Sequence, residues 1–190
     1  MAFPALDPGR ELVRFREYLS LLARLQLDPR WQGKIDLSGV VQQTLLEAHR
    51  AWAPLRQMTE TQQTAWLRRA LANNLTDEVR KLGAAMRDPA RERSLEAELE
   101  ESSSRLEAWL ALDEPSPSER ASHNEQLLQL AEALTRLPED QRRAVELHHL
   151  KGLPLGEIGA ELARSKGAVA KLIYRGIDKL HELLAERNPE

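Results

Sequence analysis

A chain of 190 residues has room for one large domain or two small ones. Charged residues make up 30% and aromatic residues only 4%, and the abundance of Leu, Ala, Glu and Arg favours helices over sheets. Because there is no cysteine, disulfides and cysteine–zinc sites are excluded. The five histidines show no metal-ligand spacing, so we expect no metal and no cofactor.

The N-terminal residues and the hydropathy pattern predict a cytoplasmic protein with no membrane insertion. Met1–Pro4 contains no basic stretch followed by an apolar core, as a signal peptide would. No apolar run approaches the roughly 18–20 residues that are needed to span a bilayer.

The net charge of −3 argues against a nucleic-acid-binding protein, but its distribution reverses that impression. Residues 66–93 contain seven basic and four acidic side chains, and residues 163–179 contain five basic and one acidic. Between them, residues 94–120 contain eight acidic and two basic side chains. The sequence therefore predicts two basic stretches separated by an acidic one.

The first half of the chain predicts three amphipathic helices. Apolar side chains recur at three- and four-residue steps over residues 12–26, which marks the first helix. Asp36 can cap a second helix, which ends before a loop at residues 53–58. Thr59 and Gln62 then form a predicted capping box that begins the third.

An acidic linker is predicted between two small helical domains. The helical pattern of residues 91–112 is interrupted by three serines, so we expect a partly ordered segment there. The run of proline and serine that follows breaks the chain, and Ser116 can cap a new helix. The predicted all-α organisation is a three- to four-helix bundle at residues 1–90, a linker at 91–115 and a four-helix domain at 116–190.

A helix-turn-helix is predicted near the C-terminus. Residues 155–162 form a short helix, and Ser165 caps a longer one after a tight turn. Placing Val169 and Ile173 inward leaves a face with basic side chains, a tyrosine and a small residue, which suits the DNA major groove. The alternative interpretation is a solvated face on a packing helix. The candidate DNA-binding residues are Lys166, Ala170, Lys171, Tyr174, Arg175 and Lys179.

Several segments resemble the extracytoplasmic-function (ECF) subfamily of bacterial RNA polymerase sigma factors, closest to a planctomycete-type subgroup. Residues 137–142, 152–158 and 167–176 are similar to that family's C-terminal promoter-reading domain. Residues 36–45 are similar to its polymerase-binding helix, and residues 65–81 to its promoter-melting helix. The matched blocks occur in the family's order over roughly residues 10–185.

The resemblance implies a factor that catalyses nothing itself, binds core RNA polymerase and directs it to promoters. It implies docking on the clamp of the largest subunit and on the flap, a −35 element read as duplex, and help in opening the −10 element. The linker would thread the polymerase cleft, and an anti-sigma protein is a further candidate partner. The implied polymerase contacts are Val41, Gln42, Thr44 and Leu45.

The −10 contacts implied by the resemblance lie in the 54–58 loop and the third helix. They are Gln57, Met58, Trp66, Arg68, Arg69, Asn73, Asn74, Arg80 and Lys81. Trp66 can stack on an unpaired base, but it is in register with core leucines and fits the core equally well. Of the two asparagines, one can instead be a buried amide with its hydrogen bonds satisfied. The arginines and Lys81 are expected to contact phosphates.

Some positions depart from the family pattern, and two rival functions remain. The family often carries acids at the positions of Gly39 and Gln43, an aromatic and a glycine in the loop at residues 55–57, and basic residues at 170 and 172. One rival is a promoter-binding regulator with an N-terminal sensor, and the other is a helical module that binds only protein. No Ser/His/Asp grouping or phosphate loop indicates an enzyme.

Overall fold

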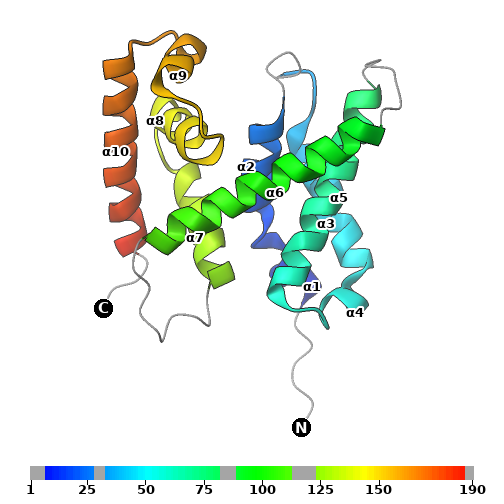
Figure 1. Ribbon diagram of the computed structural model, residues 1–190. Coiled ribbons are helices and arrows are strands. Elements are labelled where there is room, and N and C mark those ends of the chain that lie inside the picture. The colour runs from blue at the N-terminus through cyan, green and yellow to red at the C-terminus, as the bar shows by residue number, and fades with distance from the viewer. Residues whose placement is uncertain (1–6, 28–32, 82–88, 113–122, 187–190) are drawn as a thin grey trace. The chain divides into compact units, whose positions relative to one another are not determined.

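The computed structural model describes residues 7–27, 33–81, 89–112 and 123–186, and every regular element within these ranges is a helix (Figure 1). The predicted all-α class is confirmed. The chain divides into two compact units, residues 1–101 and residues 102–190, and each is described by itself.

In its described residues the first unit contains five helices and part of a sixth. They are α1 (Pro8–Val13), α2 (Arg16–Gln26), α3 (Leu37–Arg50), α4 (Trp52–Leu55), α5 (Glu60–Lys81) and the first part of α6 (Pro89–Leu112). The single helix predicted over residues 12–26 is two helices, because the chain turns tightly between Leu12 and Phe15. Both of these side chains are buried, and the Phe15 N–H donates to the Leu12 carbonyl at 3.1 Å.

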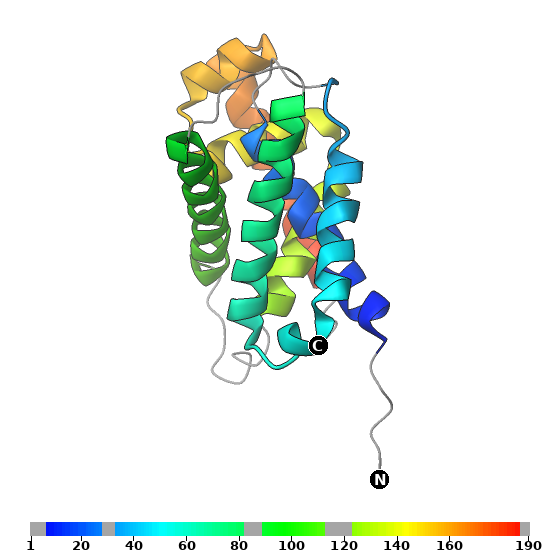
Figure 2. The ribbon, with the colours of Figure 1, turned by 90° about the vertical axis from the view of Figure 1, so that its right-hand side faces the viewer.

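The core of the first unit lies between α2, α3 and α5. Figure 2 shows α3 and α5 running side by side. Tyr18 and Leu22 from α2 are fully buried, as are Leu67 and Leu71 from α5. Burying each leucine contributes about 1.5–3 kcal/mol relative to exposure, so this apolar interface holds the helices together.

The start of α5 matches the prediction, whereas the segment before it does not. Thr59 N–H donates to Gln62 Oε1 at 2.9 Å and Gln62 N–H donates to Thr59 Oγ1 at 3.3 Å, which confirms the capping box. Residues 53–58 are not wholly a loop, because α4 covers Trp52–Leu55. Pro54 is tolerated there because the first turn of a helix leaves its N–H groups unpaired in any case.

The predicted linker region is largely helical. Helix α6 continues through the three serines without a break, and the division between the units falls within it, after Glu101. Ser103 is fully buried and donates to Glu107 Oε1 at 3.2 Å, so its hydroxyl group is satisfied inside the helix. The predicted break and cap at residues 115–118 lie outside the described residues, and the domain boundaries remain predictions.

In the described part of the chain, the second unit contains the rest of α6 and five further elements, two of which run on as one helix, so that they follow the predicted order of four helices. They are α7 (His123–Thr135), α8 (Glu139–Val145) continuing into the π-helical turn η3 (Glu146–Leu150), α9 (Leu155–Leu162) and α10 (Lys166–Ala185). Helix α10 packs against α7, α8 and α9. The core cluster that these helices share includes Ala144, Ile158, Val169 and Ile173.

Candidate nucleic-acid interface

Helices α9 and α10 form a helix-turn-helix whose turn is fixed by the backbone. Ala163 takes the left-handed conformation with φ of 52°, and the N–H of Arg164 donates to the carbonyl of Gly159 at 2.9 Å. The Ser165 hydroxyl then accepts the Ala168 N–H at 3.2 Å, which confirms the predicted cap of α10. The turn therefore sets the direction in which α10 leaves α9.

The inward side of α10 lies close against α8. Val169, Ile173, Leu180 and Leu183 are buried along this side. Gly176 is also buried, and a β-carbon added there would lie 2.7 Å from Val145 Cγ2. Because only glycine allows so close an approach, the orientation of α10 about its own axis is fixed.

The opposite side of α10 carries all six candidate −35 residues, and all six are exposed: Lys166, Ala170, Lys171, Tyr174, Arg175 and Lys179. Tyr174 is 67% exposed, which is unusual for a large aromatic side chain. Lys166, Lys171 and Arg175 form no ion pair with any residue in the described ranges. Lys179 differs, because its Nζ lies 2.7 Å from Glu182 Oε2, and this contact raises the pKa of Lys179.

Two ion pairs that sequence reasoning missed join α8 to the helix-turn-helix. Arg164 Nη2 lies 3.1 Å from Asp140 Oδ2, and Arg143 Nη2 lies 3.2 Å from Glu161 Oε1. Arg164 belongs to the basic C-terminal stretch, but its charge is partly neutralised by this contact. These pairs support the position of α9, and spacing alone could not have identified them because the partners lie 18 and 24 residues apart.

The predicted polymerase-contact residues on α3 divide between core and surface. Val41 is 2% exposed and Thr44 is fully buried, so the prediction of a docking role for these two side chains does not fit this structure. Thr44 Oγ1 donates to the Val40 carbonyl at 2.9 Å and accepts from Asn74 at 3.1 Å. Both residues face inward because α5 packs against that side of α3.

The outward side of α3 carries Gln42, which is exposed, and Leu45, which is half-buried. Leu46, which the sequence analysis did not select, is 44% exposed one turn after Gln42. Residues four apart on a helix share a face. An apolar side chain beside a polar one on this open face is the signal that could have identified Leu46.

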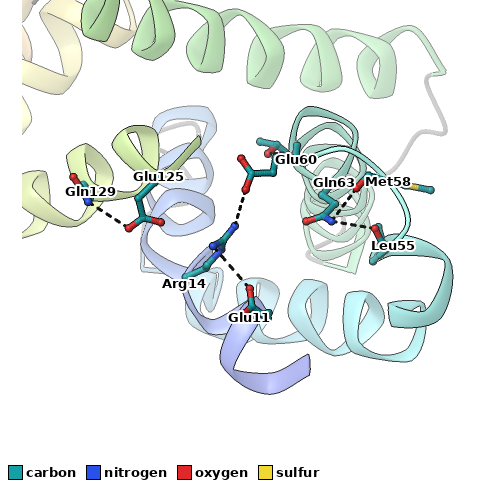
Figure 3. A network of polar contacts seen from close by, with 9 residues as sticks. Glu11, Arg14, Leu55, Met58, Glu60, Gln63, Glu125 and Gln129 are labelled. Atoms are coloured by element: carbon teal, nitrogen blue, oxygen red, sulfur yellow. Dashed lines mark hydrogen bonds and ion pairs between the residues drawn. The ribbon is translucent and has the colours of Figure 1, made fainter. Parts of the chain in front are cut away.

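The loop before α5 is held by Gln63, another residue that sequence reasoning missed. Gln63 Nε2 donates to the carbonyls of Leu55 at 3.1 Å and Met58 at 3.2 Å (Figure 3). In the same view Arg14 lies between two acidic side chains. Its Nη1 lies 3.8 Å from Glu11 Oε2, and its Nη2 lies 3.6 Å from Glu60 Oε1. The loop that presents the exposed side chains of Gln57 and Met58 is therefore fixed from within its own unit.

The candidate −10 residues on α5 do not form one surface. Arg69 and Asn73 are exposed, whereas Trp66 is half-buried. Arg68 is buried, and its guanidinium contacts Tyr18 and Glu100, so in this conformation it is not available to a phosphate. Asn74 donates to Thr44 and, at 3.3 Å, to Glu47 Oε2, which makes it the structural amide.

Arg80 and Lys81, at the end of α5, are paired with acids one turn earlier. Arg80 Nη1 lies 3.0 Å from Asp77 Oδ1, and Lys81 Nζ lies 2.6 Å from Glu78 Oε1, which raises the pKa of Lys81. All four line a polar groove of about 750 Å³ between α3 and α5. Gly39 and Gln43, the positions at which the ECF pattern often carries acids, line the same groove.

The described residues contain neither a cluster suited to a metal ion nor a helix suited to cross a membrane. No group of His, Asp and Glu side chains within these residues is suited to hold a metal ion. No helix among them has the length and apolar character to cross a membrane.

Comparisons with known proteins agree with this geometry. Residues 127–180 match the family described as sigma-70, region 4, which covers the chain from α7 into α10. The ECF RNA polymerase sigma factor SigE of Mycolicibacterium smegmatis is 35% identical over 126 residues, which are 66% of this chain and 44% of that protein. The match thus spans less than half of that relative's length.

The fold and the exposed face of α10 define a helical protein with a C-terminal helix-turn-helix of the sigma-70 type. Over the matched residues the chain is similar to the ECF sigma factors of bacterial RNA polymerase. Its assignment to a planctomycete-type subgroup remains a prediction.

Proposed function

We propose that this protein binds core RNA polymerase, directs it to particular promoters and catalyses nothing itself. The observation that carries the proposal is the exposed face of α10 within the region matched to sigma-70 region 4. There, Lys171 and Arg175 stand one helical turn apart with Tyr174 beside them. Their donors suit guanine edges and phosphates, and the ring of Tyr174 can touch a thymine methyl group.

The α10 face reads the −35 element as duplex DNA. Ala170 leaves room for the helix to approach the base edges, so the neighbouring basic side chains can reach them. Lys166 and Lys179 lie nearer the ends of the face and contact phosphates, which positions the helix without specifying sequence. The ion pair of Lys179 with Glu182 is exposed and contributes little, so phosphate can replace the carboxylate.

The first unit supplies the polymerase contact and the −10 contact. Gln42 and Leu46, with Leu45 beside them, form the surface of α3 that docks on the clamp of the largest subunit. A contiguous apolar patch with a polar rim marks a protein-binding surface, and the adjacent Leu45 and Leu46 would form the centre of such a patch. The second unit contacts the flap. An anti-sigma protein that covered either surface would prevent both contacts.

The −10 element is engaged by the loop that Gln63 holds and by the exposed side of α5. Gln57 and Met58 are presented by that loop, and Arg69 and Asn73 lie on the helix. An unstacked base held on this surface would offset part of the cost of opening the duplex. Trp66, which is half-buried, stacks on that base, and such stacking is worth about 1–3 kcal/mol per base.

The test is transcription in vitro from a genomic library with core polymerase, with and without the protein. Transcripts that start at a small set of shared sequence elements only in its presence support the proposal. Binding to core polymerase without any new start sites would contradict it and favour a module that binds only protein. Binding to duplex DNA without binding to polymerase would favour a conventional regulator.

A further inference from the structure

The basic side chains at the centre of α5 already have anionic partners within the first unit. Arg68 Nη2 lies 2.6 Å from Glu100 Oε2, and Arg69 Nε lies 3.9 Å from Glu96 Oε1. Glu96 and Glu100 stand one turn apart on α6 and so share a face. Two neighbouring arginines that the sequence assigns to phosphate contacts thus face two carboxylates at helical spacing.

A buried leucine and a hydrogen bond to α2 accompany these ion pairs on α6. Leu99, between the two acids, is fully buried. The backbone carbonyl of Glu98 accepts a hydrogen bond from Gln26 Nε2 at 3.1 Å. Helix α6 is therefore joined to α2 as well as to α5, and its position in the first unit does not rest on the arginine ion pairs alone.

The guanidinium of Arg68 depends on this contact. Its side chain is 8% exposed, whereas that of Glu100 is 59% exposed. Burial opposes the charge, but Tyr18, whose hydroxyl lies 3.2 Å from Nη1, and Glu100 together raise the pKa of Arg68. A buried cation needs an anionic partner, since removing it leaves an uncompensated charge. A partner that displaced Glu100 would have to be an anion.

We propose that α6 masks the Arg68–Arg69 surface in the free protein, and that nucleic-acid phosphates replace Glu96 and Glu100 there. This inference rests on the proposed function, because it concerns regulation of the same −10 surface. The side chains of Arg69 and Glu96 are largely exposed, at 73% and 51%, so this ion pair is weak and is screened by salt. A phosphate therefore replaces Glu96 beside Arg69 first. Arg68 follows when α6 moves away. The free protein therefore binds DNA poorly.

The first experiment removes the negative charges of α6 that face the arginines and keeps the size of the side chains. The double variant Glu96→Gln, Glu100→Gln keeps side-chain size and helical propensity but cancels both charges. Its affinity for a fluorescein-labelled single strand of about 20 nucleotides is measured by fluorescence anisotropy at low salt. We expect binding about three- to tenfold tighter than that of the wild type, since two arginines lose competing partners.

A matched control separates masking from net charge. Glu17→Gln with Glu157→Gln changes the net charge equally, and neither residue forms an ion pair with any other residue that the structure describes. The control is expected to change affinity by less than about twofold, as a distant and screened charge should. Equal gains in the control and the test variant, or no gain in the test variant, would overturn the proposal.

The second experiment follows α6 with its own residues in place. Because the chain has no cysteine, Ala65→Cys on α5 and Ala97→Cys on α6, both exposed, allow a donor–acceptor dye pair to be attached. Energy transfer should fall when the same single strand is added at saturating concentration. Unchanged transfer at saturation would overturn the proposal even if the first variants failed to fold.

Transcription with the wild-type protein distinguishes the two possible failures. If the wild type directs transcription but α6 neither moves nor competes, the masking proposal fails and the proposed function stands. If the wild type directs no transcription from any template, the proposed function itself fails, and with it the assignment of phosphate as the exchanging partner.

Discussion

Gly159 lies directly against the backbone carbonyl of Arg164, because a β-carbon added to Gly159 would approach that oxygen to 2.7 Å. The contact closes the turn between α9 and α10, and the Arg164 N–H donates to the Gly159 carbonyl on the same side. The close packing of this turn is therefore a condition for the orientation of the DNA-facing helix.

Gly159→Ala should lower the free energy of unfolding by about 1–3 kcal/mol, since overpacking forces the backbone to shift. The measurement is urea denaturation followed by circular dichroism. Gly167→Ala is the matched control, because nothing lies within 4 Å of a β-carbon added there. In a helix that substitution should be stabilising, by up to about 1 kcal/mol. Similar effects of the two substitutions would show that the turn tolerates the extra atom.

Gln42 and Thr44 should respond oppositely to substitution although they are two residues apart. Gln42→Arg should weaken association with core polymerase in a pull-down assay and leave the denaturation midpoint unchanged, because Gln42 is exposed. Thr44→Val removes one buried and one half-buried hydrogen bond and should destabilise the chain by about 1–3 kcal/mol. Loss of polymerase binding by Thr44→Val under conditions where it stays folded, with none by Gln42→Arg, would reassign the docking surface.

Arg175→Ala should cost about 1–3 kcal/mol on the best promoter and relax preference at one or two −35 positions, because a base-edge donor is lost. Reconstituted polymerase and a randomised −35 library give both quantities. Lys166→Ala is the comparison: as a phosphate contact, its loss should weaken all promoters similarly and reduce the salt dependence. If Arg175→Ala changes neither the level of transcription nor the sequence preference at the −35 element, α10 does not recognise that element.

His149 should make the stability of the second unit depend on pH. Its ring stacks on Trp109, with centroids 4.6 Å apart, and burial together with His148 lowers the pKa of His149. Below about pH 6.5 the unfolded chain takes up a proton that the folded ring resists, so the free energy of unfolding falls as the pH falls.

His149→Phe keeps an aromatic ring but removes the titrating group. The difference in unfolding free energy between about pH 7.5 and pH 5.5 should shrink in this variant, as measured by Trp fluorescence in urea. His49→Phe, at an exposed position on α3, is the control and should leave the difference unchanged. If the unfolding free energy of His149→Phe still depends on pH as in the wild type, another group causes that dependence.

The sequence alone was sufficient for the helix order of the second unit, for the caps of α5 and α10 and for the outward face of α10. These features depend on local chemistry and on the 3.6-residue period, which Thr59, Gln62 and Ser165 illustrate through the hydrogen bonds they form. The six exposed residues of α10 were predictable because the opposite face is so clearly apolar. The resemblance to sigma factors rested on the same segments.

Only the tertiary structure decided which polar residues remain available. Periodicity groups residues on one face, but it does not show which element will cover that face. Arg68 was expected at the surface and is buried, because Glu100, 32 positions later, is held beside it by α6. Thr44 turned inward because Asn74, 30 positions later, hydrogen-bonds to it. Such long-range partners depend on how the helices pack together, and the packing is set by the summed burial of apolar side chains rather than by any local pattern.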